Sequence, residues 1–478
     1  MQASDGNLYG LTSAGGANGV GTIFQYNYTT SVVTNKFDFS GAATGDTPFG
    51  SLIQATDGKL YGMTNTGGAN GIGTLFQFDL ATLGFVNKFD FAGLDGDSPS
   101  SSLMQASDGK LYGMTEIGGA NASGVLFQYD PLTSGYTKKL DFGVAANPCG
   151  SLVQASDNKF YGMTQTGGAN ALGTIFQFDP ATNIYIDKID LSGAANGDTP
   201  FGSLMQATDG KLYGVTSAGG ANGFGVLFQY DPITNILVNK FDFNGVASGD
   251  TPFGSLIQAT DGKLYGLTSA GGANGFGTLF QFNPVSNVFT NMFDFTGTAS
   301  GDTPFGSLVQ ATDGNLYGLT SAGGANGFGT LFQFNPISNA FANVFDLTGT
   351  TGDTPFGSLI QATDGMLYGV CSAGGANGFG TLFQFDPVTS TFVNKFDFAG
   401  AATGDTPMGT LKQASNGMLY GLTSAGGANG IGTLFQFDFT TNTFTNKLDF
   451  AGANGDSPQY TQLIEITAIS GAGINDIV

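Results

Sequence analysis

The sequence predicts an all-β protein, a single closed nine-bladed β-propeller with four antiparallel strands in each blade. The first observation is a tyrosine motif, LYG or FYG, that recurs nine times at spacings of 49 to 52 residues. The second is that each repeat holds four short β-type runs separated by turn signals, with no helical period. Four strands in about 50 residues make one propeller blade. The tyrosines are Tyr9, Tyr61, Tyr112, Tyr161, Tyr213, Tyr265, Tyr317, Tyr368 and Tyr420.

One repeat, residues 50–99, illustrates the four predicted strands. GSLIQA at 50–55 is followed by Asp57-Gly58, a strong hairpin signal, and then by KLYGMTN at 59–65. The glycine-rich loop at 66–73 leads to TLFQFD at 74–79, and a turn at 80–84 leads to FVNKFDF at 85–91. The segment AGLDGDSP at 92–99 is expected to be the loop into the next repeat.

The apolar residues of the third strand lie on both of its faces. Phe76 and Phe78 share one side of the predicted strand, whereas Leu75 lies on the other. Blades of a propeller pack face to face, so we expect both faces to be buried. This packing accounts for the 44 phenylalanines of the chain.

The two ends of the chain are predicted to close the ring. The first repeat begins at Met1 and lacks most of its innermost strand, while GDSPQYTQLIEIT at 455–467 aligns with GDTPFGSLIQAT of other repeats. We therefore expect a C-terminal strand at about 460–467 beside residues 8–12, which would remove the open edges. The propeller then spans 1–467 and a frayed tail spans 468–478. An open solenoid is the alternative architecture.

The charge balance limits the partners. All 14 basic residues are lysines, the chain has no His, Arg or Trp, and the formal net charge is −22. Such a surface repels phosphate backbones and anionic membranes, so we expect no nucleic-acid binding. No apolar run approaches the 18 residues of a membrane span, and no signal peptide opens the sequence as given. Cys149 and Cys371 stand where other repeats have Phe or Thr and are expected to be small core residues.

The repeat resembles two known families. The string DGKLYGMTNTGGANGIGTLFQFD resembles a kelch repeat in its di-glycine, Gly67-Gly68, and in the aromatic residue that follows the next turn, Phe85; the usual kelch Trp is missing. It is more similar to the bacterial GloVer tandem repeat, whose pattern DG-LYG-T-GG-N--GT-F covers essentially the whole chain. The resemblance implies a bacterial propeller that is secreted or carried at the cell surface, and it implies no particular activity.

Catalysis is disfavoured by the residue types. Without His the usual general base is missing, and without Arg there is no bidentate anion clamp. The acids recur at fixed blade positions, as expected of turn and strand-end acceptors, so a polysaccharide lyase or hydrolase is the least favoured alternative. Glu116, Lys138, Lys139 and Lys412 break the pattern and are interpreted as surface substitutions.

Calcium is the candidate metal. The GDTP loops and the GGANG loops should emerge at the same end of the blades, where carboxylates and amide carbonyls could ligate a hard cation. The acids could instead cap the neighbouring loop, and the ANPCG sequence that follows the third repeat is exempt. The candidate ligands are Asp46, Asp97, Asp198, Asp250, Asp302, Asp353, Asp405 and Asp456.

The same end also carries apolar loop residues that are candidates for ligand binding. A ring of them would hold a glycan or a partner protein, whereas the alternative is that they tuck under the loop and pack on the next blade. Three hypotheses remain: a non-enzymatic extracellular scaffold or adhesion module, a carbohydrate- or protein-recognition module, and an enzyme. We expect a monomer. The candidate binding residues are Phe224, Phe276, Phe328 and Phe379.

Overall fold

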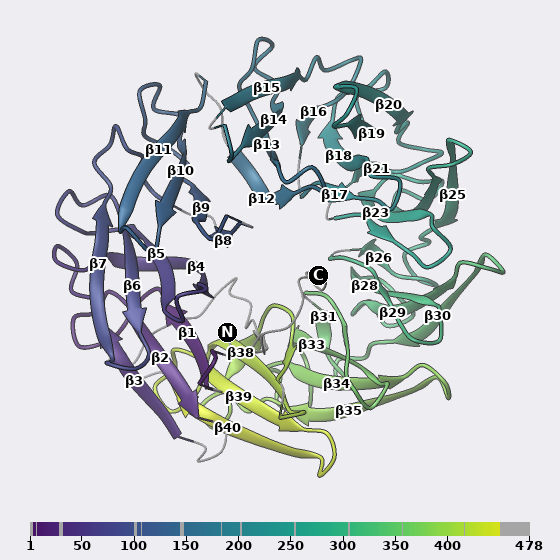
Figure 1. Ribbon diagram of the computed structural model, residues 1–478. Helices are drawn as coiled ribbons and strands as arrows, with labels where there is room; N and C mark the ends of the chain where they lie inside the picture. Colours follow the sequence, from purple (N-terminus) through teal and green to yellow (C-terminus); the bar gives the residue numbers. More distant parts are fainter. Residues whose placement is uncertain are drawn as a thin grey trace, which may run out of the picture.

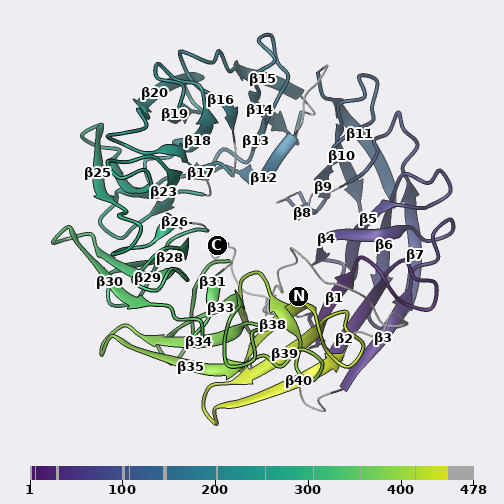
Figure 2. The same ribbon diagram turned by 180° about the vertical axis from the view of Figure 1, so that it is seen from behind.

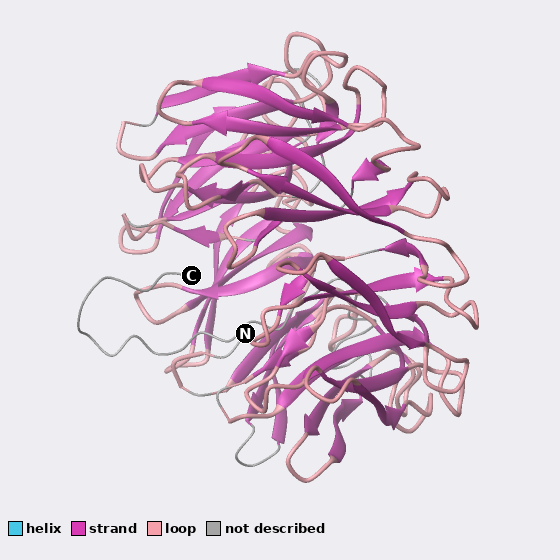
Figure 3. Ribbon diagram, turned by 90° about the vertical axis from the view of Figure 1, so that its right-hand side faces the viewer, coloured by secondary structure: helices cyan, strands magenta, loops and turns pink. Residues whose placement is uncertain are grey.

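Nine antiparallel sheets stand side by side in a ring in the computed structural model (Figures 1 and 2). Seen from the side, the ring is built of strands and loops, and the described residues include no helix (Figure 3). The predicted all-β propeller of nine blades is confirmed. The structure describes residues 3–5, 7–27, 32–99, 103–106, 108–143, 148–182, 184–200, 203–252, 255–304, 306–355, 357–414 and 416–449.

The strands follow one another outward in each blade. Blades one to four contain β1 (Leu8–Thr12), β2 (Thr22–Asn27) and β3 (Val32–Asp38); β4 (Asp46–Gln54), β5 (Leu60–Thr66), β6 (Thr74–Asp79) and β7 (Gly84–Asp90); β8 (Met104–Gln105), β9 (Leu111–Met114), β10 (Val125–Asp130) and β11 (Gly135–Asp141); and β12 (Pro148–Gln154), β13 (Phe160–Thr164), β14 (Thr174–Asp179) and β15 (Ile184–Asp190). In the remaining blades the innermost strand is divided into two pieces.

These blades, five to nine, contain β16 (Asp198–Pro200), β17 (Met205–Gln206), β18 (Leu212–Ala218), β19 (Val226–Asp231) and β20 (Ile236–Asp242); β21 (Asp250–Pro252), β22 (Ile257–Gln258), β23 (Leu264–Ala270), β24 (Thr278–Asn283) and β25 (Val288–Asp294); β26 (Asp302–Pro304), β27 (Val309–Gln310), β28 (Leu316–Ala322), β29 (Thr330–Asn335) and β30 (Ala340–Asp346); β31 (Asp353–Pro355), β32 (Ile360–Gln361), β33 (Leu367–Ala373), β34 (Thr381–Asp386) and β35 (Thr391–Asp397); and β36 (Asp405–Pro407), β37 (Lys412–Gln413), β38 (Leu419–Ala425), β39 (Thr433–Asp438) and β40 (Thr443–Asp449).

The innermost strand begins earlier than the sequence suggested. In blade six Asp250 pairs with Ala270 and Pro252 pairs with Thr268, so the Asp-Thr-Pro segment belongs to the sheet rather than to a loop. The second piece, β22, pairs Ile257 with Tyr265.

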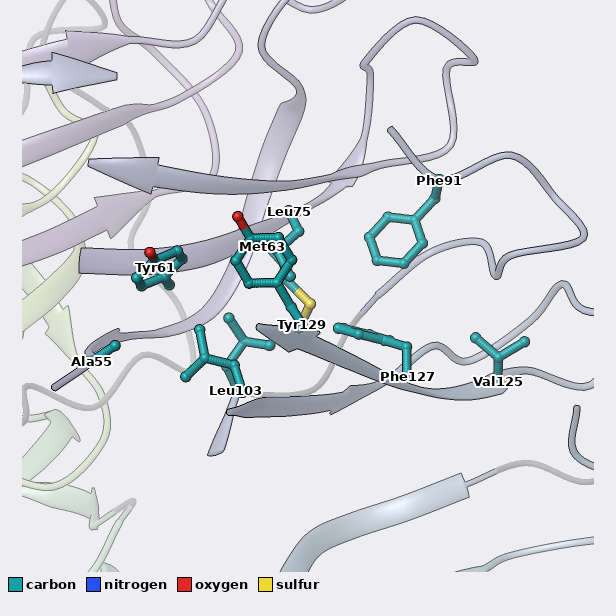
Figure 4. Packing of buried hydrophobic residues seen from close by; sticks show 10 residues of the cluster. Ala55, Tyr61, Met63, Leu75, Phe91, Leu103, Val125, Phe127 and Tyr129 are labelled. Atoms are coloured by element: carbon teal, nitrogen blue, oxygen red, sulfur yellow. The ribbon is translucent and has the colours of Figure 1, made fainter. Parts of the chain in front are cut away.

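The hydrophobic core lies in the joints between blades. At the joint of blades two and three, Tyr61, Met63 and Leu75 contact Leu103 and Phe127 (Figure 4). The opposite face of β6 packs Phe76 and Phe78 against blade one. Both faces of the third strand are therefore buried, as expected. Each fully buried phenylalanine contributes about 1.5–3 kcal/mol to the free energy of unfolding.

Stacked aromatic rings reinforce the joints at the outer strands. Phe293 of β25 and Phe341 of β30 lie parallel, with ring centroids 3.4 Å apart. The joint between blades four and five instead places Ile189 and Leu237 in one core cluster. The other stacked pairs are Phe37–Phe85, Phe89–Tyr136, Phe241–Phe289, Phe345–Phe392 and Phe396–Phe444.

The ring is closed between blade nine and blade one. Phe24 and Tyr26 share a buried cluster with Tyr420 and Leu434, and the Tyr26 hydroxyl donates to Gln436 Oε1 at 3.1 Å. A solenoid would leave these faces apart, so that alternative is excluded. The predicted closing strand at 460–467, the domain end at 467 and the tail at 468–478 lie outside the described residues. The described part of blade one has three strands.

Two further expectations concern membrane spans and cysteines. The part of the chain that the structure describes holds no helix of the length and apolarity needed to cross a membrane. Cys371 is fully buried in the core, and burial raises the pKa of its thiol to about 12, so it is an unreactive core residue as predicted. The side chain of Cys149 lies outside the described residues.

Candidate functional site

The glycine-rich loops and the connections between blades meet at one end of the ring. In blade six the glycine-rich loop spans residues 271–277. The N–H of Gly272 in this loop donates to the carbonyl of Gly245, in the preceding connection, at 2.6 Å. The loop's Phe276 carbonyl in turn accepts the N–H of Thr303, at 3.3 Å; Thr303 lies in β26, the strand that follows the next connection. The prediction that both kinds of loop share one face, here called the long-loop face, is confirmed.

Glycine is required at the second position of the di-glycine. Gly272 has a φ of +78°, and a Cβ there would lie 2.6 Å from Asp294 Oδ1. The close approach serves a hydrogen bond, because Asp294 Oδ1 accepts the N–H of Ala273 at 2.8 Å. The same carboxylate accepts Asn291 Nδ2 at 3.0 Å, and that amide also donates to Ala247 O at 2.9 Å. The strand-four acids therefore tie the long loop to the blade.

Each described candidate calcium ligand has a local hydrogen-bond partner. Asp250 is half-buried at the start of β21, and its Oδ1 accepts the hydroxyl of Thr251 at 2.8 Å. Thr251 has a φ of 52°, a strained value for a β-branched residue, so this bond helps to hold the backbone there. Asp46, Asp97, Asp198, Asp302, Asp353 and Asp405 accept the following Thr or Ser hydroxyl in the same way.

These acids do not gather into a common site. Among the described residues, no three side chains of His, Cys, Asp or Glu are grouped so that they could hold a metal ion. Asp456 lies outside the described residues. Each described acid lies at the start of the innermost strand of its own blade, or in the case of Asp97 in an isolated bridge there.

The four candidate phenylalanines occupy equivalent places on the long-loop face. Phe224 packs against Gly245 and Phe276 against Gly297, the glycines of the connection that follows strand four. Phe224 and Phe379 keep 36% and 37% of their surface exposed. Phe276 and Phe328 are half-buried against the joint cores. All four rings are therefore partly exposed on the long-loop face, and none of them is fully buried.

Lys138 has a role that the sequence interpretation missed. It stands at the position of Asn291 in blade three, and its ammonium donates to Asp141 Oδ1 at 2.8 Å and to Leu94 O at 2.7 Å. The lysine thus reaches the same two kinds of acceptor as the asparagine, which corrects its interpretation as a surface substitution. The signal for this role was available in the sequence, because Lys138 stands three residues before Asp141, as Asn291 stands three residues before Asp294. Glu116 is exposed in a loop, as expected.

A second set of polar bonds lies at the opposite end, here called the short-loop face, where the hairpin turns emerge. In blade six Tyr265 donates to Asp261 Oδ2 at 2.9 Å and accepts Gln281 Nε2 at 2.6 Å. Burial raises the pKa of Tyr265 above its ordinary value, and the hydrogen bond to Asp261 adds to the shift. The hairpin aspartates therefore serve as structural acceptors for buried hydroxyls.

Glutamine side chains link successive blades near these turns. Gln310 Oε1 accepts the N–H of Thr260 at 2.8 Å, and its Nε2 donates to the Thr260 hydroxyl at 3.0 Å. The sequence interpretation placed this glutamine in the innermost strand without a function. Its recurrence in the LIQAT string was the signal for a repeated bond across the joints.

Comparison with known proteins identifies the repeat. The model of the Gloeobacter/Verrucomicrobia repeat matches residues 1–147, 140–313 and 298–471. No curated protein matches the chain.

Two solved structures share a likeness at low identity. The extracellular domain of a candidate one-component system of B. thetaiotaomicron is 14% identical, with 93% of this chain and 64% of that one covered and a TM-score of 0.35. A puromycin-hydrolyzing peptidase of Mycobacterium tuberculosis is 10% identical, with 75% and 54% covered and a TM-score of 0.41. The chain thus spans less than two thirds of the length of either structure, and neither likeness carries a functional assignment.

Proposed function

We propose that this chain, which belongs to the Gloeobacter/Verrucomicrobia repeat family, is a non-enzymatic binding scaffold that acts in a secreted or cell-surface setting. The observation that carries the proposal is that the repeated aspartates already accept hydrogen bonds from neighbouring groups of the fold. In blade six Asp250, Asp261 and Asp294 accept bonds from a hydroxyl, a tyrosine and a loop N–H respectively. Acids held at the same position in blade after blade are structural acceptors rather than a catalytic acid and base.

The residue types add to this argument. A general base and a nucleophile need to lie within hydrogen-bond reach of each other and of a substrate. The chain contains no histidine, and Cys371 is fully buried with a raised pKa. A pair of carboxylates is the usual route to glycoside chemistry, and the engaged acids described above argue against it.

Incubation with soluble polysaccharides tests the absence of catalysis. We expect no new reducing ends and no unsaturated products when the purified chain is incubated with a broad panel, with calcium or with EDTA. Saturable binding to a glycan or a protein, measured without turnover, supports the scaffold. Product formation that increases with protein concentration and persists through repurification overturns it.

The long-loop face is the second candidate, as a recognition surface for a carbohydrate or a protein. Phe224 and Phe379 favour it, because each ring is backed by a glycine on one side and keeps more than a third of its surface exposed. An exposed ring face suits stacking on a sugar. Replacing both with serine should abolish binding to a ligand of this face, whereas Ile72→Ser at the equivalent place in blade two is the control. Unchanged binding in the double variant refutes this assignment.

Monomeric state and location are parts of the same proposal. A closed ring needs no second chain to cover its joints, so light scattering after gel filtration should give the mass of one chain. The location is tested by adding protease to intact cells of its source: a protein at the cell surface should be cleaved. With a net charge of −22, the scaffold should not retain nucleic acid at any salt concentration.

A further inference from the structure

A cleft lies between blades one and two on the short-loop face. It is an open hollow of about 440 Å³, lined by Ser4 from the first hairpin turn, by Asp57 and Lys59 from the second, and by Asp79, Leu80 and Ala81 from the turn between β6 and β7. This volume falls within the range of small-molecule sites, about 300–1,000 Å³. The cleft belongs to neither set of candidate residues discussed above.

The turn that lines the cleft departs from the repeat. Blades three and five to eight have a proline followed by a large, strongly exposed aliphatic residue at this turn, whereas blade two has Leu80 and Ala81. Leu80 is half-buried and packs against the joint core. Blade two thus has a small side chain where five other blades carry a protruding one, and blade four shares the small residue, Ala181. The aliphatic residues elsewhere are Leu132, Ile233, Val285, Ile337 and Val388.

The polar groups of the cleft retain hydrogen-bonding capacity. Lys59 Nζ lies 3.8 Å from Asp79 Oδ2, which is beyond hydrogen-bond distance. The Ser4 hydroxyl accepts Gln54 Nε2 at 2.7 Å and keeps its own hydrogen to donate. Asp57 accepts the N–H of Lys59 and the hydroxyl of Tyr61, one on each oxygen, so each oxygen has a further lone pair. The cleft therefore offers both hydrogen-bond donors and acceptors to a ligand.

The charge of the cleft selects against anions. Asp5, Asp57 and Asp79 outnumber the one cation, Lys59, among the lining residues. An anionic ligand would be repelled, because carboxylates outnumber ammonium groups at short range. Leu80 and Ala81 add an apolar surface beside the polar groups, which matches the C–H face and the hydroxyl edge of a pyranose ring.

We propose that this cleft binds a neutral hexose unit of a glycan. The inference rests on the binding-scaffold function and assigns it a site on the face opposite to the candidate phenylalanines. The hexose hydroxyls accept from Lys59 and Ser4 and donate to Asp57 and Asp79, while its apolar face rests on Leu80.

Changing the turn that lines the cleft is the central test. The double change Leu80→Pro with Ala81→Ile gives blade two the Asp-Pro-Ile-Thr turn of blade five and removes the Leu80 side chain, so the variant should fold without that apolar surface. Lys59→Met removes the cation without changing the turn. Matched controls are Ala181→Ile at the equivalent turn of blade four and Lys110→Met at the equivalent hairpin of blade three.

Calorimetric titration with neutral hexoses and their short oligomers gives the readout, with glucuronate as the anionic comparator. We expect saturable binding of at least one neutral hexose series by the parent protein. Binding should weaken by about tenfold or more in both cleft variants, the equivalent of losing one good hydrogen bond, and should be unchanged in both controls. Glucuronate should bind more weakly than its neutral counterpart.

Several outcomes overturn the hexose site. They are the absence of binding by every neutral hexose, stronger binding of glucuronate or of a polyamine than of any hexose, and unchanged hexose affinity in the variant that carries both Leu80→Pro and Ala81→Ile. Glycan binding that persists in the Leu80→Pro, Ala81→Ile variant but is lost in the Phe224 and Phe379 double variant refutes this site and leaves the scaffold function intact. Turnover of a glycan refutes the scaffold function and is detected separately as product.

Discussion

Replacing Tyr265 with phenylalanine tests the buried bonds that hold each blade's hairpin. The tyrosine is fully buried, its hydroxyl donates to Asp261 Oδ2 at 2.9 Å, and it accepts Gln281 Nε2 at 2.6 Å. Tyr265→Phe keeps the ring and removes only the oxygen. The change should therefore report on these two bonds with little effect on packing.

The expected cost follows from what the two partners lose. A hydrogen bond to a carboxylate contributes about 1.5–3 kcal/mol. The Gln281 side chain is 7% exposed and would be left without its buried partner, at a cost of about 1–3 kcal/mol. Because Asp261 can regain water at its partly exposed side, we expect the free energy of unfolding to decrease by about 3 kcal/mol.

Blade nine provides the matched control. There Asn416 replaces the aspartate and its Nδ2 donates to Tyr420 Oη at 2.9 Å, so the bond is neutral and its direction is reversed. Tyr420→Phe should therefore cost less, about 1–1.5 kcal/mol. Urea titration followed by far-ultraviolet circular dichroism gives both values, and hydrogen exchange shows whether the loss is local to one blade. Equal losses in the two variants, or a loss below about 1 kcal/mol for Tyr265→Phe, would refute the reasoning.

Phe341→Leu should lower the free energy of unfolding by about 0.5–1.5 kcal/mol more than the loss of buried apolar area alone, because it removes the stack on Phe293. An unchanged urea midpoint contradicts this. Lys138→Met should destabilise blade three, whereas Lys138→Asn should be nearly neutral, since asparagine fills this place elsewhere; comparison of the two thermal midpoints decides. Burial raises the pKa of Tyr230 from 10.0 to about 12, so its contribution to stability is complete below about pH 10 and lost as pH rises through 12. Tyrosinate absorbance and the unfolded fraction should be measured at the same pH values, and both should rise together above pH 10. Ionisation of the tyrosine while the protein is still folded would contradict the burial.

Much of the fold follows from local pattern. The spacing of the LYG tyrosines gave nine units, and the alternation of Leu75, Phe76 and Phe78 gave a strand buried on both faces, which the joint cores confirm. The Asp-Gly pairs gave the hairpins. These features depend on neighbours in sequence, so one repeat is enough to read them.

The start of the innermost strand could not be read in this way. Asp250 and Pro252 carry the signals of a loop, yet they pair with β23, because the ladder partner lies outside the segment itself. The role of Lys138 was missed for a related reason, since one of its acceptors, Leu94 O, comes from the preceding connection.

The sequence by itself determined the repeat, the strand order, the buried faces and the loops that share one end, because each is set by residue spacing within a blade. The tertiary structure alone decided which polar groups meet across the joints. It decided the hydrogen bond from Thr303 N to Phe276 O and the packing of the candidate phenylalanines against glycines of the next connection. It also decided the cleft that Ala81 helps to line. Contacts between blades depend on the rotation of one sheet against the next, which no spacing within a repeat encodes.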